Sequence, residues 1–272
     1  MDKKGFGKTA FRTGGIIVLL LLVAAAFSPW LSPYDPAAQN LAERLSGPSL
    51  SHPLGQDQHG RDILSLVIYG ARVSVIVGVG TVLLSAVVGF IAGAVSGLKG
   101  GVWDQVIMRV VDVLLAFPGI LLAIALVAVT GPGIGNVIIA LSARGWVTYA
   151  RIVRGQVLVE RERGYVEAAR SLGAGSGRII SLHLLPNTLT PVVVQATFGL
   201  AGAILAEASL SFLGLGPQEM PTWGAMLADG TSFLRNAPHI ALFPGIAIMA
   251  TVLAFNFMGD SLRDRLTKKG AE

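Results

Sequence analysis

Residues 164–187 read GYVEAARSLGAGSGRIISLHLLPN and form a polar island between long apolar runs. The first part of the island, residues 165–172, consists mostly of residues that favour a helix. Three glycines then fall within five positions, and the first of them is Gly173. Because glycine readily adopts the left-handed conformation in which many helices end, we predict a short helix that ends at Gly173.

The second part of the island, residues 178–185, has an amphipathic pattern. Pro186 and Asn187 come directly after it. We expect a new helix to begin there and to enter the membrane, because proline is tolerated in the first turn of a helix. The island therefore predicts a compact polar loop between two apolar helices.

The composition is that of a polytopic membrane protein. Of the 272 residues, 53% are hydrophobic and 14% are charged, and the mean hydropathy is +0.66, which is too apolar for a soluble domain of this length. The net charge of +5 comes from basic residues in loops beside apolar runs, which fits orientation in a bilayer better than a nucleic-acid-binding face. The chain has no cysteine, and its four histidines lack the spacing of a metal site.

Six apolar runs predict an all-α integral membrane protein with six transmembrane helices. The first run also has features of a secretory signal, but the runs that follow it favour an uncleaved helix. We divide the chain into residues 1–69, with the first helix and an extracytoplasmic loop, and residues 70–267, with five helices and the polar loop. The predicted spans lie at about residues 14–31, 73–95, 106–129, 137–153, 188–210 and 240–257.

Four ionisable residues inside or near these spans are candidates for an intramembrane polar pathway: Arg109, Asp112, Arg144 and Glu207. Arg109 and Asp112 are three positions apart on one helical face, so they can pair with each other near the membrane edge. Pro118, in the same span, is expected to kink it. Arg144 lies near the middle of a span, where a charge is costly unless it faces a protein partner, a water-filled path or an acidic neighbour.

The polar island resembles a motif of a known family. Glu167-Ala168-Ala169, then Gly173, then Leu185-Pro186, is similar to the "EAA" loop of bacterial ATP-binding-cassette (ABC) importer permeases. The general pattern has isoleucine where this chain has His183, and the branch that carries dipeptides, oligopeptides and nickel often has histidine there. The resemblance implies a loop that docks on an ATPase. The implied coupling residues are Tyr165, Glu167, Ala168, Ala169, Arg170, Leu172, Gly173, Arg178, His183, Leu185 and Pro186.

Further segments resemble the same branch. The loop before the second span contains His52 and the triplet Gly60-Arg61-Asp62. These residues are also typical of a capped turn, with Gly60 in the turn and Asp62 at the start of a helix, and both readings can hold together. The other matching segments are residues 207–216, 221–224 and 256–264.

The resemblance implies the type I ABC importer permease fold and a transport subunit rather than an enzyme. In that family, separate subunits bind ATP and Mg²⁺, so we expect no cofactor, metal or catalytic residue in this chain. The implied partners are a second homologous permease, two ATP-binding subunits, an extracytoplasmic solute-binding protein and the lipid bilayer. Dipeptides or oligopeptides are the implied cargo, and nickel is the alternative.

Three other classes of membrane protein fit the sequence less well. An ion channel would need a filter-like loop of carbonyl groups, and none is apparent. A transporter driven by an ion gradient usually shows two repeated halves, which this sequence lacks. A membrane enzyme would need convergent acid, base or nucleophile groups, but the ionisable residues of the spans are few and dispersed.

The distribution of positive charge orients the predicted spans. Six spans place both termini on one side of the membrane, and that side carries 16 of the 21 lysines and arginines. The opposite side carries four, and Arg144 lies within a span. Because loops rich in lysine and arginine remain in the cytoplasm, we expect a bacterial inner-membrane protein with both termini and residues 164–187 cytoplasmic.

This orientation predicts the behaviour of two reporter fusions. A reporter placed after Leu266 is expected to read cytoplasmic, and one inserted near Pro48 is expected to read extracytoplasmic. Paired phosphatase and fluorescent-protein fusions in whole cells measure both positions. The opposite pair of readings would contradict the six-span arrangement.

Overall fold

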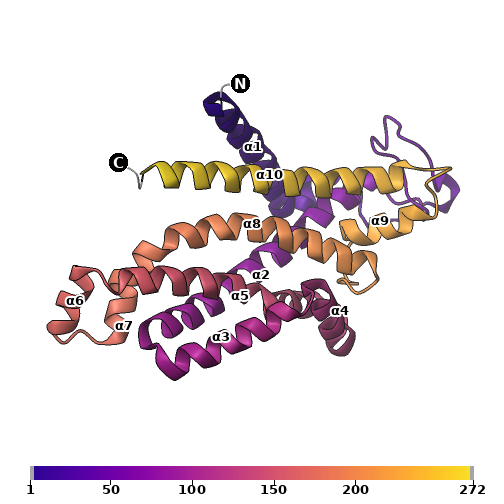
Figure 1. Cartoon of the computed structure of the whole chain (residues 1–272). Helices are drawn as coiled ribbons and strands as arrows, with labels where there is room; N and C mark the ends of the chain where they lie inside the picture. Colours follow the sequence, from indigo (N-terminus) through magenta and orange to yellow (C-terminus); the bar gives the residue numbers. More distant parts are fainter. Residues whose placement is uncertain (1–2, 270–272) are drawn as a thin grey trace.

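The computed structural model describes residues 3–269, and these residues form helices joined by loops, the longest over residues 32–62, with no named strand (Figure 1). The all-α prediction is therefore confirmed. Five helices precede the polar island, and five more, with a π-helical turn (η2), form the island and the rest of the chain. The elements are α1 (Lys3–Leu31), η1 (Leu41–Glu43), α2 (Ile63–Lys99), α3 (Gly101–Ala116), α4 (Gly119–Thr130), α5 (Ile134–Glu160), α6 (Gly164–Ser171), α7 (Ser176–Ile179), η2 (Ile180–Leu184), α8 (Leu185–Phe212), α9 (Trp223–Thr231) and α10 (His239–Lys269).

Each of the six predicted spans lies in one helix or, for residues 106–129, in the bent pair of α3 and α4. In the part of the chain that the structure describes, four helices are long and apolar enough to cross a membrane, within α1, α2, α8 and α10. A fifth is counted if the bent pair of α3 and α4 is taken as one span. The predicted span 137–153 lies inside α5, a 27-residue helix that is about 40 Å long and carries several arginines.

Helix α2 begins earlier than the sequence indicates. The predicted span starts at about residue 73, whereas α2 starts at Ile63 and has 37 residues. Such a helix is about 55 Å long, well beyond the roughly 30 Å of a hydrocarbon core. Its first turns therefore extend beyond the hydrocarbon layer, or the helix tilts strongly within it.

The predicted kink at Pro118 is a complete break. Helices α3 and α4 meet at 91° on either side of Phe117 and Pro118. Phe117 has an extended backbone, with φ −91° and ψ 136°. A residue before proline is driven out of the helical conformation by the proline ring, which explains why the helix stops here instead of bending.

Helix α5 packs against α2 along a line of glycines. A Cβ atom at Gly89 would lie 2.4 Å from the carbonyl oxygen of Trp146, and one at Gly93 would lie 2.5 Å from that of Ala150. Gly97 continues the line one turn later. Glycine at every fourth position exposes the backbone of α2 on one face, so the two helices approach more closely than side chains would allow.

The two termini lie at the same end of the molecule as the polar island. The guanidinium of Arg265 lies over the ring of Phe11, 4.1 Å from its centroid, so the ends of α1 and α10 meet. The last turns of α10 line a pocket together with Thr190 at the start of α8. At the other end of α10, His239 Nε2 lies 3.2 Å from the carbonyl oxygen of Gln56 in the loop before α2. Figure 1 shows these two ends on opposite sides of the bundle.

The glycine line predicts the effect of a single added methyl group. Gly93→Ala places a Cβ against the backbone of α5 and is expected to destabilise the protein by about 1–3 kcal/mol, because the helices must separate. The melting temperature of the purified assembly should fall by several degrees, at about 2–4 °C per kcal/mol. Gly135→Ala, at a position with nothing within 4 Å, is the matched control. Equal melting temperatures for the two variants would contradict this packing.

Candidate coupling segment and intramembrane pocket

Helix α6 ends at Gly173 as the sequence predicts. Gly173 has φ +82°, the left-handed conformation. The amide of Leu172 donates to the carbonyl of Ala168, and that of Ala174 donates to the carbonyl of Ala169, each at 3.0 Å. The second of these bonds is the one that defines a Schellman helix end. The chain therefore reverses direction at Gly173, where a residue with a side chain would be strained.

The second part of the island differs from the prediction of a new helix at Pro186. Helix α7 runs without a break through η2 into α8, and Pro186 lies in the first turn of α8. The amide of Leu185 donates to the carbonyl of Ile180, five residues earlier. A π-helical turn widens the helix, which makes room for a proline that lacks an amide donor. The segment is thus mechanically continuous with α8.

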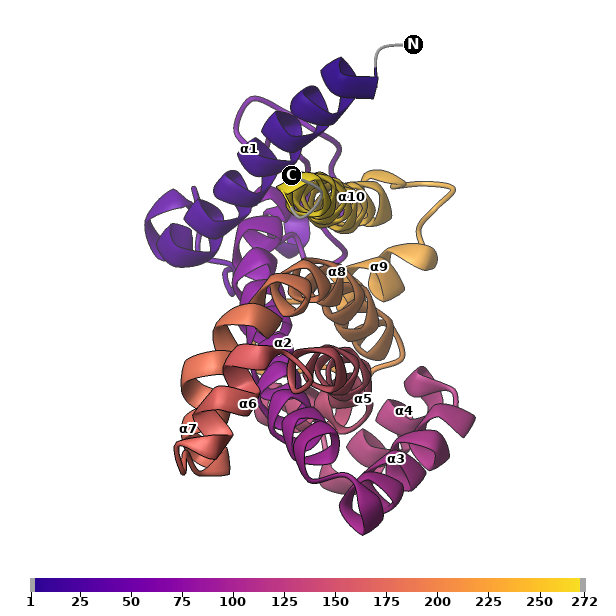
Figure 2. The same cartoon turned by 60° about the vertical axis from the view of Figure 1, so that its left-hand side comes forward.

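Residues 164–187, which we call the coupling segment, are attached through one buried side. Val166, Ile179 and Leu184 are at most 2% exposed and pack in one cluster with Val153 and Val157 of α5. Ala94 and Leu98 of α2 belong to the same cluster. Figure 2, in which this end comes forward, shows α6 and α7 beside the ends of α2 and α5. The segment is therefore packed against α2 and α5, the two helices that approach each other along the glycine line.

The other side of the coupling segment is exposed and partly apolar. Leu172 is 88% exposed and Tyr165 is 42% exposed, and Glu167 and Ala168 also face outward. The remaining predicted residues of the segment are placed as follows: Ala169 and Leu185 are half-buried, Arg178 and Pro186 are exposed, and the side chains of Arg170 and His183 lie outside the described residues. Leu172 directly follows the last residue of α6, and together with Tyr165 it makes this exposed side partly apolar.

An ion pair and further hydrogen bonds hold together the helix ends against which the coupling segment packs. Arg154 of α5 makes two bonds to Asp104 of α3, from Nε at 2.6 Å and from the terminal nitrogen at 2.7 Å. Ser96 of α2 donates to the same carboxylate. Arg161 donates to the carbonyl of Gly97 at 2.9 Å. A two-point bond between arginine and carboxylate fixes orientation as well as distance, so the ends of α2, α3 and α5 are held together.

Arg144 lines a pocket of about 360 Å³ between α2, α4, α5 and α8. Four polar atoms on its walls have no hydrogen-bond partner in the protein: Thr81 Oγ1, Ser85 Oγ, Arg144 Nε and Tyr149 OH. Sequence reasoning identified only Arg144. The other three are ordinary polar residues in apolar helices, and only their convergence in space sets them apart. Among residues 3–269, Arg144 forms no ion pair with an acidic side chain, so the acidic neighbour considered for it is not found there.

The other pathway candidates are not brought to this pocket. Glu207 is fully buried in α8, where one oxygen accepts a bond from Ser211 Oγ at 2.6 Å and the other has no partner. Arg109 and Asp112 are both exposed on α3. Neither takes part in an ion pair among the described residues, so the possible pairing between them is not formed in this structure.

The loop before α2 forms the capped turn that its residues predict. Asp62 caps α2, accepting from Ser65 N at 2.8 Å, and its other oxygen lies 3.0 Å from His52 Nδ1. The buried carboxylate of Asp57 accepts bonds from the backbone and the guanidinium of Arg61. At Gly60, with φ +71°, a Cβ would lie 1.9 Å from the carbonyl oxygen of Asn40. His52, Gly60, Arg61 and Asp62 therefore build one rigid turn.

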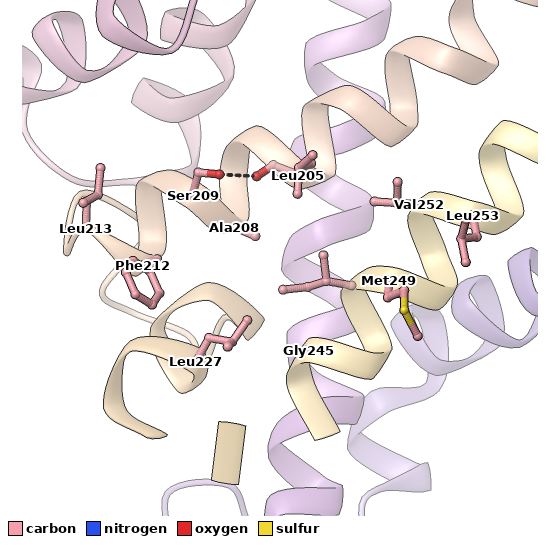
Figure 3. Close-up of a pocket in the computed structure, with 11 residues that line it drawn as sticks. Leu205, Ala208, Ser209, Phe212, Leu213, Leu227, Gly245, Met249, Val252 and Leu253 are labelled. Atoms are coloured by element: carbon pink, nitrogen blue, oxygen red, sulfur yellow. Dashed lines mark hydrogen bonds between the residues drawn. The ribbon is translucent and has the colours of Figure 1, made fainter. Parts of the chain in front are cut away.

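A larger groove of about 600 Å³ lies between α8, α9 and α10 (Figure 3). Its walls are hydrocarbon, including Phe212, Met249 and Leu253. The hydroxyl of Ser209 donates to the carbonyl of Leu205 at 2.8 Å, so the polar group seen in the figure is already satisfied. The groove is suited to apolar contact and offers little to recognise a polar solute. Across residues 3–269, no group of three or more His, Cys, Asp or Glu residues is arranged to hold a metal ion.

Comparison with known proteins connects these features to a family. Residues 85–270 match the family described as "binding-protein-dependent transport system inner membrane component", and residues 7–48 match the "N-terminal TM domain of oligopeptide transport permease C". The chain is 48% identical, over 259 residues, to the glutathione transport system permease protein GsiD of Escherichia coli O6:K15:H31, covering 94% of this chain and 86% of that protein. The protein of the same name from Shigella boydii serotype 4 gives the same figures.

A solved structure shares the fold. An inward-facing structure of the MetNI methionine ABC transporter is 20% identical in sequence and superposes with a TM-score of 0.61. The match covers 74% of this chain and 97% of that one. At this level of identity, the likeness concerns the fold alone.

Proposed function

The chain belongs to the family of binding-protein-dependent transport system inner membrane components, and we propose that it carries small peptides as one of two permease subunits. It is an ABC importer permease of the peptide branch, a membrane protein that transports and does not catalyse a reaction itself. ATPase and binding-protein subunits belong to such an importer. The cargo, the number and placement of the partner subunits, and the orientation in the membrane are part of this proposal.

The proposed cargo is a small peptide such as glutathione. Relatives named as glutathione permeases are 48% identical to this chain, and the alignment covers 94% of this chain and 86% of theirs. Glutathione is a tripeptide with two carboxylates and one amine, so it lies within the dipeptide and oligopeptide class that the sequence motifs imply. Cargo selection is then shared between the binding protein and the membrane path.

The exposed face of α6 is the observation that carries the assignment of partners. Tyr165 of this helix and Leu172, directly after it, are exposed, while Val166 of the helix is buried in a cluster with residues of α2 and α5. We assign this face to the groove of an ATP-binding subunit, one of two, each beneath one of two homologous permeases. ATP and Mg²⁺ are bound by those subunits. The coupling segment and both termini are then cytoplasmic, and the rigid turn before α2 faces the binding protein.

The geometry supports a simple transmission of force. A push on α6 passes through Val166, Ile179 and Leu184 to the ends of α2 and α5, because buried packing resists compression. The same push passes along the unbroken helix from α7 to α8. Movement of the ATPases therefore reaches the membrane helices as a displacement of whole elements, as in other switching proteins.

The cargo assignment is tested by transport in vesicles. The purified importer, with its second permease and ATPases, is reconstituted in proteoliposomes with ATP inside and binding protein outside. We expect accumulation of labelled glutathione or dipeptides that stops when either ATP or the binding protein is withheld. Uptake of nickel without uptake of any peptide would contradict the peptide assignment.

The coupling assignment predicts a difference between two neighbouring glycines. Gly173→Val forces a β-branched residue into a left-handed conformation, at a cost of about 1–2 kcal/mol, and should turn α6 away from the ATPase. We expect at least a tenfold loss of uptake and of cargo-stimulated ATP hydrolysis, with normal membrane insertion. A tenfold change corresponds to about 1.4 kcal/mol.

Gly175→Val is the matched control, because Gly175 lies in the same loop, has open space around it and has no positive φ. Co-purification of the ATPases separates loss of assembly from loss of coupling. If both valine variants transport as the wild type does, the coupling segment does not act through the turn at Gly173.

A further inference from the structure

The pocket beside Arg144 contains more unsatisfied hydrogen-bonding capacity than packing explains. Thr81, Ser85 and Tyr149 are only 5%, 2% and 3% exposed, and the hydroxyl of each has no partner in the protein. These three residues and Arg144, whose Nε also has no partner, all line one pocket. A buried polar group without a partner costs free energy, and the cost is higher inside a membrane where water is scarce. Four such groups in one place indicate that something else satisfies them.

The four groups share one chemical property, the ability to donate a hydrogen bond. A guanidinium only donates, and a hydroxyl donates or accepts. No carboxylate lies among the side chains that line the pocket, and Arg144 belongs to none of the ion pairs found in residues 3–269. A positive charge surrounded by donors is complementary to an anion with several acceptor sites. A carboxylate has that form, and it forms strong charge-assisted bonds with arginine.

Glycines allow the neighbouring helices to approach these groups closely. A Cβ at Gly145 would lie 2.3 Å from Ser85 Oγ, and one at Gly199 would lie 2.7 Å from Tyr149 OH. A Cβ at Gly119, in the first residue of α4, would lie 2.9 Å from Arg144 Cδ. Three different helices thus place a glycine against a donor-bearing side chain. A larger residue at any of these three positions would therefore displace a side chain that lines the pocket.

We propose that this pocket binds a carboxylate group of the peptide cargo on its way through the membrane, with Arg144 as the charge partner and Tyr149 as a second donor. The proposal rests on the proposed function, since it names the part of a small peptide that the membrane path recognises. A volume of about 360 Å³ accommodates part of a tripeptide. Glutathione carries two carboxylates, so it offers an anion at either end.

The test measures binding to the complete importer without the solute-binding protein. The complex of this chain, the second permease and the ATPases is placed in nanodiscs, and labelled glutathione competes with unlabelled glutathione or with its diamide. The diamide has the same size and shape but no carboxylate. We expect the wild-type complex to prefer glutathione by about tenfold or more, as for a desolvated ion pair.

Substitutions at the two donors assign this preference to the pocket. Arg144→Gln should reduce the preference to about onefold, and Arg144→Lys should keep part of it, because lysine retains the charge but not the fork of donors. Tyr149→Phe should weaken it about threefold without harming stability, because the hydroxyl has no partner in the protein. Arg72→Gln, an exposed arginine of α2 outside the pocket, should leave it unchanged.

Three results would overturn the proposal. The first is a wild-type complex without preference for glutathione over the diamide. The second is an unchanged preference in Arg144→Gln. The third is loss of the second permease from that variant together with an unaltered preference in Tyr149→Phe, since Arg144 would then serve an acidic side chain of the other subunit. ATP-driven uptake by the wild type separates this failure from failure of the proposed cargo.

Discussion

The close approach of α5 to α2 along Gly89, Gly93 and Gly97 is the contact on which the other features depend. Helix α5 carries Arg144 and Tyr149 into the pocket at one level. Further along, its buried valines seat the coupling segment, and Arg154 braces the neighbouring helix ends. If larger side chains replaced the glycines, both the pocket and the seat of the coupling segment would shift.

This arrangement connects the coupling segment to the pocket through the helices that they share. Val157, which supports α6, and Tyr149, which lines the pocket, are two turns apart on the same helix. Gly199 of α8 lines the pocket from the opposite side, on the helix that continues from the coupling segment. Under the proposed coupling, a displacement of α6 reaches the pocket through α5 and α8, two of the four helices that line it.

Much of this structure is readable from the sequence where local chemistry decides the outcome. The helix end at Gly173 follows from the conformational freedom of glycine, and the capping role of Asp62 follows from its side chain. Proline at 118 indicates an interruption, but its 91° angle depends on how α4 packs against α5. The π-helical turn before Pro186 likewise lies beyond a local pattern, because a break and a widened turn both accommodate proline.

Tertiary contacts decided the features that the sequence left open. Arg144 was recognisable as a costly charge in an apolar run, but Thr81 and Ser85 have no local signal, and only the fold brings their hydroxyls to Arg144. The pairing of Arg109 with Asp112 is not formed for a related reason. Spacing on a helix permits contact between two charges, but it does not require the side-chain conformations that bring them together.

The central claim is that the coupling segment contacts an ATP-binding subunit. Photo-crosslinking from the exposed end of α6 tests it most directly. A benzophenone amino acid replaces Leu172, which is 88% exposed, or Leu50, which is fully exposed in the loop at the opposite end of the molecule. In the assembled importer, illumination should join the chain labelled at position 172 to an ATP-binding subunit, while position 50 should not capture that subunit. Capture of the ATPase from position 50, or its absence from position 172 in an active importer, would contradict the account.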